Sequence, residues 1–258
     1  MSVLGHQHLV RDLLVQSSQR WQIINIRGTT TEIYIFSHLI WACIPNLESL
    51  TVSVFFSRVT LYPLDMFQTA PKLREVKLSG RESTMKLPTH QLVNFCSLTY
   101  YNQNPLSLLI NAHHPENLGF GAWKLGPITN INMISLPNLK RLHIRVYQSS
   151  QPFLFDFLTV PVLECLHIQV LLITVDTALL QSLAEMASRS ESGNLPHLQE
   201  LRIWSKWGEM PEGFDGVLKL TPALRVLETP IPSPRDTYTH SCINELRPMA
   251  SLAGQDEG

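Results

Sequence analysis

One eight-residue pattern returns along this chain and limits its possible folds more than any other feature. Each copy begins with proline, has leucine two residues later, and has aliphatic residues three and five positions after that leucine. The six copies span residues 45–52, 71–78, 137–144, 161–168, 196–203 and 222–229, the last without its final aliphatic residue. A unit this short buries its apolar side only by stacking on neighbouring units. The pattern therefore predicts a solenoid.

The spacing of the copies indicates which kind of solenoid this is. The first leucine position is assigned to Leu47, Leu73, Leu92, Leu118, Leu139, Leu163, Leu198 and Leu224. Most of the intervals between these leucines match the period of roughly 20–29 residues that leucine-rich repeats have. The longest interval, from Leu163 to Leu198, requires an insertion. Trp21 takes the same position in an earlier unit. The units at Leu92 and Leu118 fit less well, since Ser97, Gly121 and Trp123 occupy aliphatic positions.

Each unit combines two kinds of local structure. The aliphatic residues alternate as in a strand with one buried face, and the repeated proline is expected to end the preceding helix. Residues 176–187 have helical spacing, residues 62–70 and 151–158 suit shorter helical turns, residues 9–14 a short helix, and residues 119–121 a turn. We predict an α/β leucine-rich-repeat solenoid over residues 1–230, with a curved parallel sheet, helices or turns on the convex side, and an irregular tail at 231–258.

Composition argues against several classes of function. Twenty Lys and Arg balance twenty-one Asp and Glu, so no general attraction to nucleic acid or an acidic membrane is expected. The four cysteines are widely separated, without the close pairs of zinc or disulfide frameworks. Neither a secretory signal nor an apolar run long enough to span a membrane is found. We therefore expect a cytoplasmic or nuclear protein with no nucleic-acid or membrane partner.

The residues between the buried aliphatic positions are the candidates for binding. In the predicted solenoid they form columns on one face of the sheet, and repeat proteins bind partners on such faces. Arginine and tryptophan are favoured at protein interfaces. The predicted partner-binding residues are Arg141, His143, Arg145, His167, Arg202 and Trp204. The alternative is a solvated polar face that binds nothing.

Other chemistry is not indicated by the sequence. His143 and His167 occupy matching positions, but a metal site needs a third ligand, and none is apparent. No hydrolase nucleophile, zinc-protease or phosphate-loop motif is present. We expect no enzymatic activity, no metal and no cofactor.

The repeat copies also resemble a known family. Over residues 9–229 the chain resembles the repeat region of the large F-box/leucine-rich-repeat families of fungi. The segments that carry the resemblance are residues 20–26, 70–76, 136–139 and 220–224 and the copies at Pro45 and Pro161. The resemblance implies a role in choosing the substrate of a cullin-type ubiquitin ligase. In that family a three-helix F-box docks the ligase adaptor. About twenty residues precede the first predicted strand, so we expect no F-box here and adaptor binding only if one is supplied elsewhere. The alternative is a stand-alone scaffold or truncated member.

Overall fold

The computed structural model describes most of the predicted repeat region. The described residues are 13–14, 16–39, 44–55, 67–80, 86–99, 109–112, 114–122, 133–146, 154–171, 177–190, 193–205 and 213–229. The predicted tail at 231–258 and most of the predicted helix at 9–14 lie outside them, as do Trp123 and the first residues of both predicted helical turns.

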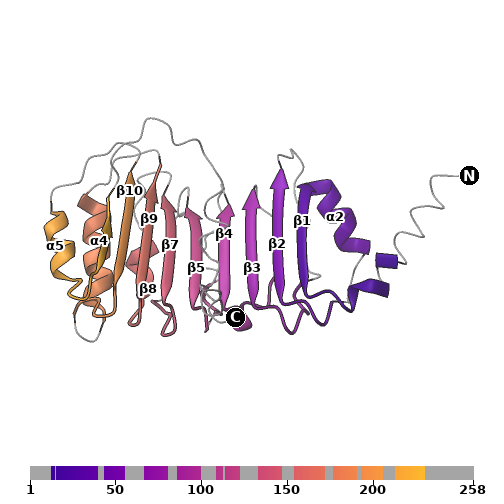
Figure 1. The fold of residues 1–258 in the computed structure, drawn as a ribbon, viewed down its shortest axis with the longest axis horizontal. Coiled ribbons are helices and arrows are strands. Elements are labelled where there is room, and N and C mark those ends of the chain that lie inside the picture. The colour runs from indigo at the N-terminus through magenta and orange to yellow at the C-terminus, as the bar shows by residue number, and fades with distance from the viewer. Residues whose placement is uncertain are drawn as a thin grey trace, which may run out of the picture.

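The described chain is a mixed α/β structure built on one large parallel sheet (Figure 1). Its nine strands are β1 (Ile23–Thr29), β2 (Ser49–Phe55), β3 (Glu75–Gly80), β4 (Asn94–Thr99), β5 (Asn117–Ala122), β7 (Arg141–Val146), β9 (Cys165–Val170), β10 (Glu200–Ser205) and β11 (Val226–Glu228). Each strand pairs in parallel with the next of these, and β1 and β11 form the two open edges. Strands β6 (Ile134–Ser135) and β8 (Leu158–Thr159) form a separate parallel pair. The predicted α/β class and parallel sheet are confirmed.

Helices lie towards both ends of the sheet (Figure 1). They are α2 (Thr30–Leu39), α4 (Thr177–Ser188) and α5 (Phe214–Lys219), with short 3₁₀ turns η1 (Thr89–Gln91) and η2 (Leu154–Phe157). Buried residues of all three helices belong to the same core as the strands, so the helices pack on the apolar side of the sheet towards its two ends (Figure 1). No helix among the described residues is long and apolar enough to cross a membrane.

Two of these helices test the sequence predictions directly. Helix α4 lies within one residue of the predicted bounds at each end. Helix α2 was not predicted, although it starts with a capping box. The Thr29 backbone N–H donates to Glu32 Oε2 over 2.7 Å. The Glu32 backbone N–H donates in return to Thr29 Oγ1 over 3.4 Å. The hydrogen bond from the Thr29 backbone lowers the pKa of Glu32.

The repeated proline has a different role from the predicted one. In every copy with proline, the leucine N–H donates to the carbonyl of the residue before the proline, as Leu139 does to Leu136 over 3.2 Å. This hydrogen bond closes a β-turn with proline at its second position, where the fixed φ of proline suits the turn. Both ends of the Leu136–Leu139 turn are buried and its two central residues are exposed. The proline therefore begins a turn that points the following leucine into the core, and in the copies at Pro137 and Pro161 it follows a short strand, not the predicted helix.

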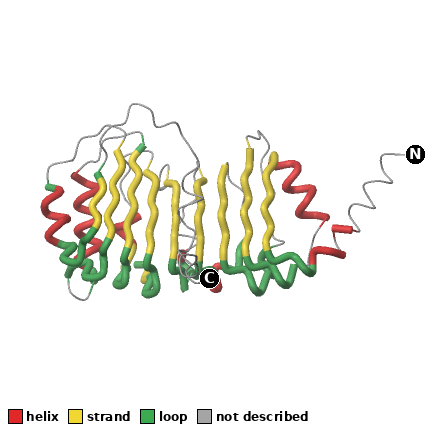
Figure 2. The backbone as a smooth tube through the Cα atoms, in the orientation of Figure 1, coloured by secondary structure: helices red, strands yellow, loops and turns green. Residues whose placement is uncertain are grey.

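A shared carbonyl joins each unit to the next at the point where the strand begins. The Lys140 carbonyl accepts from both Glu164 N–H, over 2.8 Å, and Cys165 N–H, over 2.9 Å. The same double acceptance recurs at Gln22, Glu48, Arg74, Val93, Glu116, Glu164 and Gln199. These turns all lie at the end of the sheet where the strands begin (Figure 2). The shared hydrogen bonds therefore fix the position at which each strand starts relative to its neighbour.

The core consists of aligned rows of apolar side chains running across the strands. One row contains Leu50, Val76, Phe95, Leu118, Leu142, Leu166 and Leu201, all buried. Leu118 pairs with Leu142 and therefore occupies the second leucine position, not the predicted first one, which the buried Pro115 takes. With this register both alternating positions hold buried apolar residues, Leu118 and Phe120, and the misfit at Gly121 and Trp123 disappears.

The middle of the sheet contains two further departures from the repeat. Residues 119–121, predicted as a turn, lie inside β5. A Cβ atom on Gly119 would lie 3.0 Å from Cys96 Sγ, so the glycine allows a close contact between β4 and β5. Ser97 does occupy an aliphatic position, as predicted, and is only 5% exposed. Its neighbour in the register is the large ring of Phe120, which also contacts Phe95.

We expect Leu142→Ala and Leu166→Ala each to lower the free energy of unfolding by about 2–5 kcal/mol, because each leaves a cavity in the aligned row. Arg141→Ala is the matched control, since Arg141 is exposed beside Leu142 on the same strand. We expect this control to change stability by less than about 0.5 kcal/mol. Urea unfolding of the three variants measures these changes. Equal losses of unfolding free energy for Leu142→Ala and Arg141→Ala would contradict the assignment of Leu142 to the core side of β7 and Arg141 to its exposed side.

Candidate functional site

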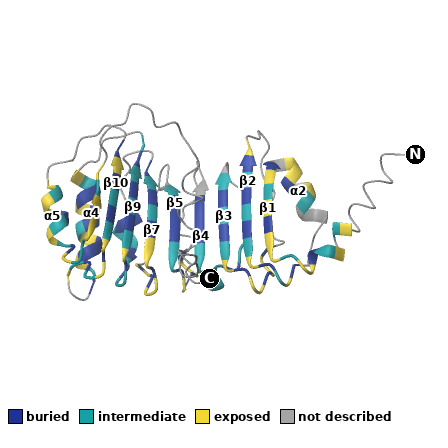
Figure 3. Ribbon diagram, in the orientation of Figure 1, coloured by how far each residue is buried: buried dark blue, intermediate teal, exposed yellow. Residues whose placement is uncertain are grey.

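The strand positions that alternate with the core rows form a second face of the sheet, here called the polar face. On β9 the burial alternates residue by residue between this face and the core (Figure 3). On strands β7, β9 and β10 the polar face contains Arg141, His143, Arg145, Cys165, His167, Gln169, Glu200, Arg202 and Trp204. All six predicted binding residues therefore lie together on three adjacent strands. Whether they bind a partner stays a prediction.

The six residues differ in how accessible they are. Arg141 is exposed and Trp204 is 45% exposed, whereas His143, Arg145, His167 and Arg202 are partly buried. Arg145 Nε donates to Gln169 Oε1 over 2.8 Å, which fixes its guanidinium against the sheet. Arg141 and Trp204 are thus the two predicted residues that a partner would reach most easily.

Charges on this face are partly compensated within it. Arg202 forms ion pairs with Glu200 through Nε and with Glu228 through Nη1, the second over 3.4 Å. Arg141 forms no ion pair with a carboxylate among the described residues. Burial, together with the nearby charges of His167 and Arg145, lowers the pKa of His143 to about 4, so its ring is neutral at pH 7. Arg141 therefore offers a positive charge to a partner.

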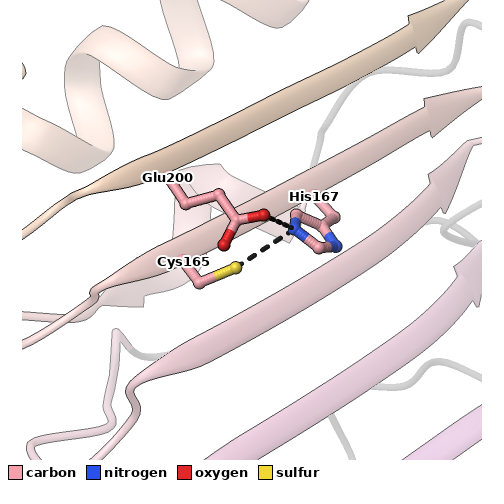
Figure 4. A group of neighbouring side chains, drawn as sticks. All are labelled: Cys165, His167 and Glu200. Atoms are coloured by element: carbon pink, nitrogen blue, oxygen red, sulfur yellow. Dashed lines mark hydrogen bonds and ion pairs between the residues drawn. The ribbon is translucent and has the colours of Figure 1, made fainter. Parts of the chain in front are cut away.

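A three-residue cluster in the middle of this face was missed by sequence reasoning. His167 Nε2 lies 3.1 Å from Cys165 Sγ and 3.1 Å from Glu200 Oε1, and all three side chains are partly buried. Both partners approach the same ring nitrogen, while the second ring nitrogen points away (Figure 4). The signal was available, because aligning the copies at Pro161 and Pro196 puts Cys165 beside Glu200. The sequence prediction considered only the two histidines as metal ligands and did not consider the cysteine and the glutamate beside them.

The cluster has the residue types of a cysteine nucleophile with its base, but not the geometry. In such a triad the thiol contacts one ring nitrogen of the histidine and the acid orients the other. Here Cys165 and Glu200 share Nε2. Burial, with the neighbouring carboxylate of Glu200, raises the pKa of the Cys165 thiol to about 12. The reactive thiolate is therefore scarce at pH 7.

The carboxylate of the cluster is ionised. Burial acts to raise the pKa of Glu200, but its hydrogen bond to His167 and the charge of Arg202 outweigh burial and lower that pKa below its ordinary value. The cluster therefore presents a protonated thiol, an imidazole and a carboxylate, all directed at one point. This arrangement suits binding rather than nucleophilic attack.

Comparison with known proteins adds no further assignment. No protein-family model matches this chain, and no curated protein or solved structure is detectably similar to it. The resemblance to the F-box/leucine-rich-repeat families therefore stays a prediction from the sequence.

We expect Cys165 to be alkylated by iodoacetamide on the order of 30–100 times more slowly than an ordinary cysteine at pH 8, once metals are removed with EDTA. A raised thiol pKa leaves less thiolate, and the higher nucleophilicity of that thiolate compensates only in part. The rate should keep rising with pH up to about pH 10, where ordinary thiols have levelled off. Peptide mass spectrometry of the native and urea-unfolded chain measures this, the unfolded chain being the control. Rapid modification of native Cys165 at pH 7 would indicate an activated nucleophile instead.

Proposed function

We propose that this chain is a leucine-rich-repeat solenoid that binds another protein on the polar face of β7, β9 and β10. In this proposal it acts without catalysis, in the cytoplasm or nucleus, as the substrate-recognition part of an F-box-type ubiquitin-ligase receptor. The second candidate is a stand-alone repeat scaffold with no link to ubiquitin transfer. Both candidates share the binding surface and differ in what happens to the bound protein.

The observation that carries the proposal is the position of Arg141 and Trp204 on opposite corners of one polar patch. The register places them on strands two spacings apart, about 10 Å, at the first and last polar rows. Exposed arginine and tryptophan side chains are the residue types that most often dominate binding energy at protein interfaces. The described helices pack on the other face of the sheet, so none of them covers this patch.

The chemistry of the patch favours a particular kind of partner. Arg141 offers a guanidinium with no carboxylate partner among the described residues, and Trp204 offers a partly exposed ring. A protein segment with a carboxylate and a neighbouring apolar side chain would satisfy both. Glu200 and Arg202 form an ion pair with each other on β10, so they contribute shape more than net charge.

We expect Arg141→Ala and Trp204→Ala each to reduce capture of the partner at least tenfold, because truncation of an interface anchor typically costs about 2 kcal/mol or more. Thr51→Ala is the matched control, since Thr51 occupies the polar face of the distant strand β2. Capture by the immobilised chain from a cell extract, followed by quantitative mass spectrometry, identifies proteins lost with both patch variants and retained with the control. If every captured protein binds the patch variants and wild type equally, the polar patch is not the binding surface.

The two candidate roles differ in the fate of the captured protein. If the chain serves a ubiquitin ligase, we expect its depletion from cells to lengthen the half-life of that protein, measured after blocking protein synthesis. Re-expression of the wild-type chain should restore the half-life, and the Trp204→Ala variant should not. An unchanged half-life with intact binding would favour the scaffold over the ligase receptor.

A further inference from the structure

We propose that Cys165, His167 and Glu200 form a zinc-binding site on the polar face. This inference does not rest on the proposed function, because zinc binding can be measured on the chain without a partner. Cysteine sulfur, histidine nitrogen and a carboxylate oxygen are the three ligand types that proteins use for Zn²⁺. In the described part of the chain, this is the group of such side chains whose ligand atoms all lie within 4.8 Å of one another.

The two distances from the histidine nitrogen to the other ligand atoms are close to those of a tetrahedral site. With zinc–sulfur and zinc–nitrogen distances of about 2.3 and about 2.0–2.1 Å, tetrahedral angles separate sulfur from nitrogen by roughly 3.5 Å and nitrogen from oxygen by roughly 3.3 Å. The observed separations from His167 Nε2 are 3.1 Å to Cys165 Sγ and 3.1 Å to Glu200 Oε1. Both separations are therefore within about half an ångström of the tetrahedral values, and Cys165 Sγ lies within 4.8 Å of the ligand oxygen of Glu200.

The three side chains are held in place by separate parts of the fold. Cys165 and His167 lie two residues apart on β9 and so project from the same face of one strand. Glu200 starts β10, directly paired with Cys165, and its carboxylate contacts Arg202. The backbone register fixes the three Cα positions, and the contacts among Cys165, His167, Glu200 and Arg202 already restrain the side chains, which reduces the loss of side-chain freedom on binding.

Zinc would replace hydrogen-bonding protons in the cluster. The Cys165 thiol loses its proton on binding, and His167 must present the lone pair of Nε2, with its ring proton on the other nitrogen. The thiolate and carboxylate together balance the charge of the ion, while Arg202 stays paired with Glu228. Three protein ligands leave the fourth tetrahedral position to water.

The ligand set also selects among metals. Mg²⁺ and Ca²⁺ prefer oxygen ligands, and two of the three ligands here are sulfur and nitrogen. Thiolate and imidazole favour Zn²⁺ and the similar Co²⁺ over these ions. We therefore expect zinc to bind in the presence of excess magnesium.

Calorimetric titration of the full EDTA-treated chain with zinc chloride tests the site. We expect one zinc per chain for this site, affinity at least about tenfold weaker in each of Cys165→Ser, His167→Ala and Glu200→Gln, and release of a proton that makes binding weaken as pH falls. Titration with Co²⁺ should produce a thiolate-to-cobalt absorption band that Cys165→Ser abolishes. Circular dichroism of each variant checks that it is folded. If the other two variants do not fold, Glu200→Gln still tests the site, because it keeps the shape of the side chain.

The controls separate this site from other zinc-binding side chains. Cys96→Ser removes a thiol on β4, and His197→Ala removes an exposed histidine close to Glu200 in sequence. Both control variants should bind zinc like the wild type. The inference is overturned if zinc does not bind, if the cobalt band survives Cys165→Ser, or if the three cluster variants retain wild-type affinity.

Discussion

The sheet depends on a shared carbonyl at the start of each strand after β1, and six of its nine strands are also preceded by a turn with proline at its second position. Proline presets the backbone of the turn, and the closing hydrogen bond points the following leucine into the core. The next unit then attaches by two consecutive N–H groups to one carbonyl of the unit before it, as at Lys140. Because the two N–H groups belong to the residues that enter the strand, these backbone hydrogen bonds fix where each strand after β1 begins relative to its neighbour. A slip by one residue would turn the leucine row towards water.

The same constraint determines what the polar face can do. Residues far apart in the sequence, such as Cys165 and Glu200, become direct neighbours because both occupy the first position of their strands. The insertion that separates them is occupied mainly by α4, which packs on the apolar side and does not disturb the pairing of β9 with β10. The structure thus tolerates a long unit on one face while keeping a regular array of side chains on the other.

Much of this arrangement could be predicted from the sequence, for reasons that differ between elements. The Pro137 and Pro161 units were placed correctly because each has leucine at both repeat positions, so only one register buries them. The register predicted for the unit at Leu118 was wrong because the first leucine position holds Pro115. Leu118 fits both the first and the second leucine position, so the sequence pattern did not distinguish them. Helix α2 was missed since its residues 30–39 are apolar on several sides, although the Thr29 and Glu32 capping pair marks its start. The metal-ligand cluster was missed because it combines three residue types from two units, which no single motif contains.

The zinc site and the proposed protein-binding patch are physically linked, since both use β9 and β10. Exchange of the thiol proton for Zn²⁺ adds one positive charge to the centre of a patch that already contains Arg141 and Arg145. That charge would strengthen the attraction of the patch for a carboxylate, and the water at the fourth zinc position could be exchanged for such a group from a partner.

Glu200 connects the two functions, because its carboxylate contacts both His167 and Arg202. A metal bound to Glu200 would weaken the ion pair between Glu200 and Arg202. The ion pair of Arg202 with Glu228, on the edge strand β11, would then carry more of the charge compensation of Arg202. Metal binding would in this way alter both the charge of the patch and the ion pairs that connect β10 to the end of the sheet.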